Sequence, residues 1–215
     1  MEEKKYLRIV NHYENCLDKY GDTPQGVDWP KKEMAEATYR VMLEVIKPNT
    51  DKKVSFLDFG CGASHLYEYI QKRGIRNIEY SGLDISQKYI DLSRRKFPSL
   101  NFYLADILDQ NVTLPDFDYI ILNGVFTEKR ELTFDEMFAY FQPVILKVFA
   151  KARIGIAFNL ISKQVDWERD DLFHMPLDTL AWFLKKNVSR HFIIRHDYEL
   201  YSYTTYVYRE PNVAP

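Results

Sequence analysis

The sequence predicts an α/β fold in which helices cover both faces of a seven-stranded, mostly parallel sheet. Apolar runs of strand length alternate with amphipathic helical patterns from residue 54 onward, which is typical of βαβ units. The last two apolar runs, 191–200 and 201–209, leave no room for a crossover helix. We therefore predict that they form an antiparallel hairpin at one end of the sheet.

The first 47 residues are predicted to form a helical cap on this sheet. Apolar side chains recur at helical spacing over 3–20, and the turn-rich segment 21–30 follows. A second helical stripe starts at Pro30 and stops at Pro48. We expect a single domain, 1–215, made of the cap (1–47) and a ligand-binding core (48–215).

The stretch VSFLDFGCGAS, residues 54–64, organises that core. It predicts a buried strand over 54–59, a glycine turn and a helix over 63–73. Gly60 and Gly62 allow a ligand to approach the backbone closely. Asp58 at the strand end favours a cationic or amine-bearing ligand and would repel a pyrophosphate. His65 stands where the dinucleotide-binding fingerprint has its third glycine.

Two further strands end in acidic residues. The run 78–84 ends at Asp84, which follows Gly60 at roughly the 20-residue spacing of a ribose-binding acid. The run 101–105 is followed by Asp106. The alternative for each acid is a loop residue or a helix cap. Ser86 is positioned to cap a helix that runs to Phe97.

The second half of the chain continues the alternation. A fourth strand is predicted over 118–123 and a fifth over 152–159. Between them, Thr133 and Glu136 form a capping-box pattern for a helix toward residue 150. Pro143 should kink that helix or divide it in two. Another helix is predicted after Pro176.

With these motifs the chain resembles the class I S-adenosylmethionine-dependent methyltransferases over roughly residues 28–208. Asp58, Gly60 and Gly62 match the family's acid-x-G-x-G motif, and Ser64 departs mildly from the usual last glycine. The resemblance implies a Rossmann-like fold and S-adenosylmethionine as cofactor, with Asp84 on the ribose and Asp106 on the adenine side. It implies cofactor contacts from the following residues: Asp58, Gly60, Cys61, Gly62, Asp84, Ile85, Asp106, Ile107 and Asn123.

The acceptor site is expected beyond the carboxyl ends of the strands and under the amino-terminal cap. Tyr20, Trp29 and Phe126 are candidates for lining it, with plain packing as the alternative for each. The segment 160–176 is long enough to form a lid, and it carries Trp167 and His174. His174 is a candidate general base for a hydroxyl acceptor; the alternative is a solvated loop residue.

The composition and the cysteine count argue against several classes of binding partner. There are 29 basic and 31 acidic residues, so no basic field favours nucleic acid. Two distant cysteines predict no disulfide framework, and no apolar run approaches the ~20 residues of a spanning helix. We expect a cytoplasmic protein with no membrane or nucleic-acid partner and no metal, because no His or Cys cluster has metal-ligand spacing. The oligomeric state stays open.

The predicted activity is methyl transfer from S-adenosylmethionine to a small polar molecule, at oxygen. Two alternatives keep the same cofactor: a protein or RNA methyltransferase, and a non-catalytic regulatory module. A nicotinamide-dependent enzyme is disfavoured by His65 and by the predicted terminal hairpin.

Overall fold

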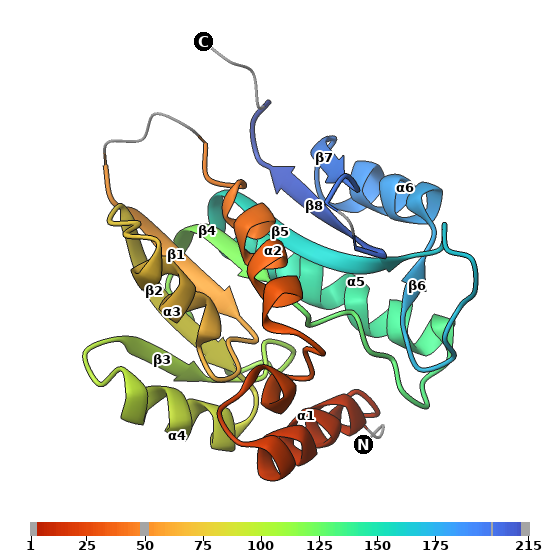
Figure 1. Cartoon of the computed structure of the whole chain (residues 1–215). Helices are drawn as coiled ribbons and strands as arrows, with labels where there is room; N and C mark the ends of the chain where they lie inside the picture. The colour runs from red at the N-terminus through yellow and green to blue at the C-terminus, as the bar shows by residue number, and fades with distance from the viewer. Residues whose placement is uncertain (1–3, 48–51, 199, 212–215) are drawn as a thin grey trace.

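The computed structural model describes residues 4–47, 52–198 and 200–211. These residues form one mixed sheet with helices packed around it (Figure 1). The strand order is β3-β2-β1-β4-β5-β8-β7, with a short β6 paired to β5. β1 to β5 run parallel, whereas β8 is antiparallel to both β5 and β7. The predicted fold class is confirmed. The strands are β1 Val54–Phe59, β2 Ile78–Asp84, β3 Asn101–Leu104, β4 Phe117–Leu122, β5 Ala152–Ser162, β6 His174–Met175, β7 His191–Arg195 and β8 Ser202–Tyr208.

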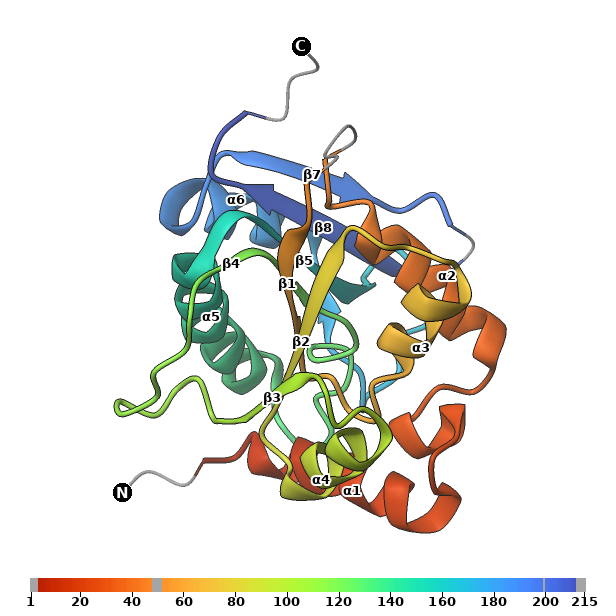
Figure 2. The same ribbon diagram turned by 90° about the vertical axis from the view of Figure 1, so that its left-hand side faces the viewer.

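Helices pack on both faces of the sheet. Figure 2 shows α5 and α6 on one side and α2 and α3 on the other. The helical elements are α1 Leu7–Tyr20, the 3-10 turn η1 Pro24–Val27, α2 Lys32–Leu43, α3 His65–Lys72, α4 Gln87–Lys96, α5 Phe134–Lys151 and α6 Leu177–Asn187. The predicted stop at Pro48, and with it the start of the predicted core, lies outside the described residues.

Alternation along the central strands divides the core in two. In β4, Ile120 and Leu122 pack toward α5 and α6, while Tyr119 and Ile121 pack toward α2 and α3. All four side chains are buried. A strand covered on both faces has no solvent side, which explains its continuous apolar run.

Pro143 does not divide the helix that contains it. α5 runs without interruption from Phe134 to Lys151, so of the two predicted outcomes, a kink or a division, the division is wrong. Phe141, Val144 and Ile145 flank the proline and are fully buried. Their burial on the sheet outweighs the one helical hydrogen bond that proline cannot donate.

The segment after β5 is more ordered than the sequence indicates. β5 continues to Ser162, three residues beyond the predicted end, because β8 pairs with it as far as Ile161. β6 then returns to pair with β5. The loop that remains is 163–173, shorter than the predicted lid 160–176.

Within the described parts of the chain, no helix combines the length and the apolar composition needed to cross a membrane.

Candidate functional site

A cavity of about 530 Å³ lies at the carboxyl ends of the parallel strands. The chain leaves β1 toward β2 and β3 on one side and later enters β4 and β5 on the other, so the strand order reverses between β1 and β4. Open α/β sheets bind ligands at this switch point. Residues of α1 and of the turn after η1, such as Tyr13 and Trp29, also line the cavity.

The glycine loop passes from β1 to α3 through left-handed conformations. Gly60, Gly62 and Ser64 have φ angles of 74°, 50° and 58°. The amides of Gly60 and Cys61 both donate to the carbonyl of Leu83, at 2.7 and 2.9 Å. These bonds hold the loop against the end of β2 and leave the glycines facing the cavity.

Ser64 replaces the glycine that is usual at the end of this motif, and its side chain has a structural role. The hydroxyl is fully buried and donates to Ser93 Oγ at 2.7 Å. Ser93 in turn donates to the carbonyl of Gly62 at 2.9 Å. This chain of bonds ties the loop to α4, which compensates for the strained φ of a non-glycine residue.

Asp58 lines the cavity from the end of β1 and is almost fully buried. Its carboxylate accepts a hydrogen bond from Tyr80 Oη at 2.7 Å. Burial, together with the nearby charge of Asp84, raises the pKa of Asp58 to about 7 despite that hydrogen bond. A cation placed beside Asp58 would therefore be strongly favoured.

Asp84 connects two backbone segments at the end of β2. Its Oδ2 accepts from the Gly62 amide and its Oδ1 from the Ser86 amide, both at 2.9 Å. Burial raises the pKa of Asp84 to about 6, although both amide bonds favour the ionised form. A carboxylate has about four acceptor positions, so it can still accept bonds from a ligand hydroxyl.

Asp106 is held by the amino-terminal segment. Lys4 Nζ and Tyr6 Oη donate to its Oδ2 at 2.7 and 2.6 Å, and the Leu108 amide donates to Oδ1 at 3.0 Å. Burial alone would raise the pKa of Asp106, but the bonds from Lys4 and Tyr6 outweigh it and hold the pKa below its usual value. The carboxylate therefore orders the cap over the cavity.

Two asparagines in the cavity have polar atoms without a partner. Asn123 Oδ1 and Asn159 Nδ2 are buried and make no hydrogen bond within the described structure. Asn159 Oδ1 accepts from the Gly124 amide at 2.8 Å, which orients its side chain. Buried polar atoms of this kind need a partner, and a polar ligand supplies one.

Glu128, on the acceptor side of the cavity, is not among the site residues predicted from the sequence. Its side chain is buried and accepts from Arg130 at 3.2 Å. Burial, followed by the nearby carboxylate of Asp28, raises the pKa of Glu128 above its usual value. Phe126 was the predicted acceptor residue in this segment after β4, and nothing local distinguishes Glu128 from its charged neighbours. Asn159 was detectable, because it ends the apolar run of the fifth predicted strand.

Cofactor residues predicted from the sequence come together around one cavity. Asp58, Gly60, Cys61, Gly62, Asp84, Ile85, Asp106, Ile107 and Asn123 all line it. Trp29 and Trp167 line it as well, although Trp167 is 70% exposed.

Two of the predicted acceptor residues lie elsewhere. Tyr20 is exposed and its side chain does not line the cavity. Phe126 is fully buried in the core, with its ring centroid 4.9 Å from that of Phe141. The turn after β4 directs the ring inward because α5 packs beneath it, so Phe126 walls no acceptor pocket.

The structure also argues against His174 as a general base. The ring is buried at the edge of the cavity, in β6. Its Nδ1 lies 2.7 Å from the Ser162 carbonyl, and its Nε2 accepts from the Arg169 amide at 3.1 Å. Because Nδ1 donates to a carbonyl and the lone pair of Nε2 already accepts a backbone amide, no lone pair is free to take a proton from an acceptor.

The cavity is strongly acidic. Arg169 is the single lysine or arginine among the described residues that line it. Its guanidinium already pairs with Asp171. The lining carboxylates are Asp28, Asp58, Asp84, Asp106, Glu128 and Asp166. This distribution favours a ligand that carries positive charge.

Comparisons with known proteins agree with this geometry. Residues 56–144 match a family described as a methyltransferase domain. A Mycobacterium tuberculosis protein that is named as a methyltransferase is 27% identical over 164 residues, which is 74% of this chain and 95% of the relative.

Solved structures share the fold. Magnesium protoporphyrin IX methyltransferase from Synechocystis PCC 6803, with bound S-adenosylhomocysteine, superimposes with a TM-score of 0.64. The match covers 95% of this chain and all of that one at 15% identity. The plantazolicin methyltransferase BpumL, in complex with S-adenosylhomocysteine, gives a TM-score of 0.58 at 12% identity, over 97% of this chain and 92% of that one.

Proposed function

We propose that this class I S-adenosylmethionine-dependent methyltransferase transfers its methyl group to a hydroxyl of a small polar molecule held inside the cavity. The observation that carries the proposal is the single cavity in which the glycine loop, the acidic strand ends and Glu128 meet. Its volume of about 530 Å³ is within the usual range for small-molecule sites.

The residues present suit the cofactor. Asp58 would bind a positively charged group, and Asp84 would accept bonds from the ribose hydroxyls. The unpartnered atoms of Asn123 and Asn159 offer an acceptor and a donor to the amino-acid end. When bound, S-adenosylmethionine supplies a methyl group on a positively charged sulfur. The acidic lining stabilises that charge, and the cap excludes water from it.

Glu128 would take the proton from the acceptor hydroxyl. A general base must lie in the cavity and have a pKa raised toward neutrality, and Glu128 meets both conditions. Arg130 orients its carboxylate from one side. The chain's part in the reaction is then to align the acceptor oxygen, exclude water and accept one proton.

A small acceptor is supported by the way the cavity is covered. α1 lies across it, and Tyr13 Oη donates to the Gly124 carbonyl at 3.1 Å. Tyr89 Oη contacts the carbonyls of Tyr13 and Gly26 at 2.8 and 2.6 Å. A folded protein or a nucleic-acid strand would have to displace this cover.

A second candidate is methylation at nitrogen. Asp28, Glu128 and Asp166 all line the cavity, and Arg169 is the single lysine or arginine among the described lining residues. An amine-bearing acceptor would be attracted by that field, and Glu128 would then remove the ammonium proton before transfer.

The test begins with calorimetric titration of the protein with S-adenosylmethionine, S-adenosylhomocysteine and NAD in parallel. We expect the first two to bind and NAD not to bind. Incubation with labelled S-adenosylmethionine and pools of small hydroxyl and amine compounds, peptides or RNA then identifies the acceptor by mass spectrometry. Methyl uptake by peptides or RNA alone would contradict the proposal, and binding without any uptake would favour a regulatory module.

A further inference from the structure

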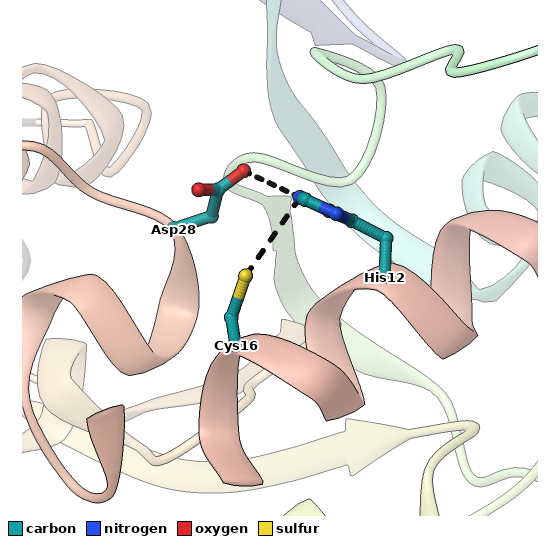
Figure 3. Close-up of side chains that lie close together, drawn as sticks. All are labelled: His12, Cys16 and Asp28. Atoms are coloured by element: carbon teal, nitrogen blue, oxygen red, sulfur yellow. Dashed lines mark hydrogen bonds and ion pairs between the residues drawn. The ribbon is translucent and has the colours of Figure 1, made fainter. Parts of the chain in front are cut away.

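Three metal-ligating side chains converge in the cap, and one of them, Asp28, also lines the cavity. His12 and Cys16 are four residues apart and therefore share one face of α1. Asp28 follows η1 and points back at them (Figure 3). The ligand atoms of the three side chains lie within 4.8 Å of one another.

The geometry is convergent. His12 Nε2 lies 2.8 Å from Asp28 Oδ2 and 3.8 Å from Cys16 Sγ. Both contacts go to the same ring nitrogen, as Figure 3 shows. A cysteine nucleophile activated by a His–Asp pair would use the two ring nitrogens separately, one for each partner. Here the nitrogen, sulfur and oxygen atoms of the three side chains face a common point, which is the arrangement of a metal-coordination site.

We propose that His12, Cys16 and Asp28 bind a divalent, borderline-soft cation such as Zn²⁺. Bonds of 2.0 to 2.3 Å in a tetrahedral zinc site place ligand atoms about 3.3 to 3.6 Å apart. The two separations from His12 Nε2, 2.8 and 3.8 Å, bracket that range, and all three ligand atoms lie within 4.8 Å of one another. Side-chain rotations that draw Cys16 and Asp28 toward a common centre would admit the ion. One nitrogen, one sulfur and one oxygen ligand suit Zn²⁺ and leave a fourth position for water.

The backbone at Asp28 supports the arrangement. Asp28 has φ 60° and ψ 26°, a left-handed conformation that asparagine and aspartate adopt more readily than most residues. Its amide donates to the Gln25 carbonyl, and the next amide, of Trp29, donates to the Pro24 carbonyl. The turn is therefore closed by its own bonds, and the carboxylate is directed at α1.

Charge around the cluster favours a cation. A thiolate and the Asp28 carboxylate would together neutralise a divalent ion, and the Glu128 carboxylate adds to the negative field. The positive charges that act on Cys16 come from Arg130, which is already paired with Glu128 and Asp171 at 3.2 and 3.4 Å, and from Lys19. His12 and Asp28 are partly exposed, with side-chain exposures of 22% and 36%, so an ion can enter from solvent.

A bound ion would hold two parts of the cap together. α1 and the turn after η1 both cover the cavity, and the ion would join them by direct bonds. The sequence predicts no metal because no His or Cys cluster has metal-ligand spacing. The third proposed ligand, Asp28, lies beyond a turn from the i, i+4 pair of α1. Only the packing of the turn against α1 brings Asp28 to the other two ligands.

Cobalt titration tests the proposal without using methyl transfer. Apo-protein prepared with a chelator is titrated with Co²⁺, whose thiolate complex absorbs in the near ultraviolet, and then with Zn²⁺. We expect one equivalent of Co²⁺ to produce the thiolate absorption and Zn²⁺ to abolish it. Cys16→Ser should lose the absorption, whereas Cys61→Ser, at the other cysteine, should keep it.

Asp28→Asn is the second variant, because asparagine keeps the left-handed turn and removes only the charge. It should weaken Zn²⁺ affinity by more than roughly 10- to 100-fold, the loss that outer-shell substitutions already cause. Circular dichroism checks that each variant is folded. Absence of the absorption in the parent protein, or Zn²⁺ affinity unchanged in both folded variants, would overturn the proposal.

Discussion

The carboxylate of Asp84 accepts the amide of Gly62 at 2.9 Å, so the acid at the end of β2 directly holds the glycine loop that follows β1. The same carboxylate accepts the Ser86 amide at the start of α4. One side chain therefore joins the two turns that are predicted to bind the cofactor. We expect cofactor binding to depend on Asp84 through the loop as well as through direct contact.

Asp84→Ala should weaken S-adenosylmethionine binding by about 1–3 kcal/mol, the scale of a hydrogen bond to a charged group. Calorimetry measures the change. Asp91→Asn on the outer side of α4 is the matched control, because Asp91 bonds only Gln87 among the described residues and should leave binding unchanged. Equal affinity of Asp84→Ala and the parent would remove Asp84 from the site.

Cofactor affinity should rise with pH. Burial raises the pKa of Asp58 to about 7 and that of Asp84 to about 6. Both are therefore protonated in acid and ionised above neutrality, and the ionised pair attracts a positively charged ligand. The dissociation constant of S-adenosylmethionine should fall as pH rises from about 5 to 8, and the dependence should be weaker in Asp58→Asn. An affinity independent of pH would contradict the role of Asp58.

The raised pKa of Asp58 has the opposite effect on stability: higher pH should strengthen cofactor binding but weaken the ligand-free fold. The folded pKa of Asp58, about 7, lies above its ordinary value of 3.8, so the folded state holds more protons between these values. The free energy of unfolding of the ligand-free protein should therefore fall as pH rises through this window. Denaturant titrations should show a smaller fall in Asp58→Asn. A parent protein that gains stability across the window would show that Asp58 is not buried as described.

Gly60→Ala should destabilise the protein for two separable reasons. Its φ of 74° is strained for alanine, and an added Cβ would lie 2.6 Å from Val125 Cγ2. Gly74→Ala is the matched control, since its φ is 66° and nothing lies within 4 Å of its Cβ position. The control should lose about 1–2 kcal/mol for the backbone conformation, and Gly60→Ala should lose about 1–3 kcal/mol more for overpacking. Equal denaturation midpoints would show that Val125 moves aside freely.

Glu128→Gln should slow methyl transfer by roughly 10²- to 10⁴-fold while leaving S-adenosylmethionine affinity unchanged, because it removes a general base and keeps the side-chain shape. Single-turnover rates with the acceptor from the screen measure the effect. Glu131→Gln, in the same segment but exposed, should keep the parent rate. A Glu128→Gln rate within a few-fold of the parent would exclude the base.

Asp106→Asn should loosen the cap. The substitution weakens the bonds from Lys4 and Tyr6 that hold the amino-terminal segment. Hydrogen exchange of the α1 amides should become faster, and cofactor release with it. Asp109→Asn is the control, because Asp109 also pairs with Lys4 but does not contact Tyr6. If exchange in α1 is the same in both variants, Asp106 does not anchor the cap.

Local pattern was sufficient for the sheet, for the glycine loop and for most helix starts. β2 occupies the predicted 78–84, Ser86 caps α4, and Thr133 and Glu136 form the predicted capping box. Each of these features depends on residues only a few positions apart, so the local sequence is enough to predict it. Only the structure excluded a division of the helix at Pro143, because burial on both sides of the proline depends on the sheet below.

The sequence by itself determined the fold class and the acidic, glycine-lined end of the sheet, because strand periodicity and strand-end residues are local properties. Tertiary structure decided what those residues contact. Asp106 meets Tyr6 across 100 positions, and Phe126 turns into the core instead of the cavity. Glu128 gains its raised pKa, and His12, Cys16 and Asp28 converge, only when the cap packs over the strands. Burial and long-range pairing set these properties, and neither is encoded at a fixed spacing along the chain.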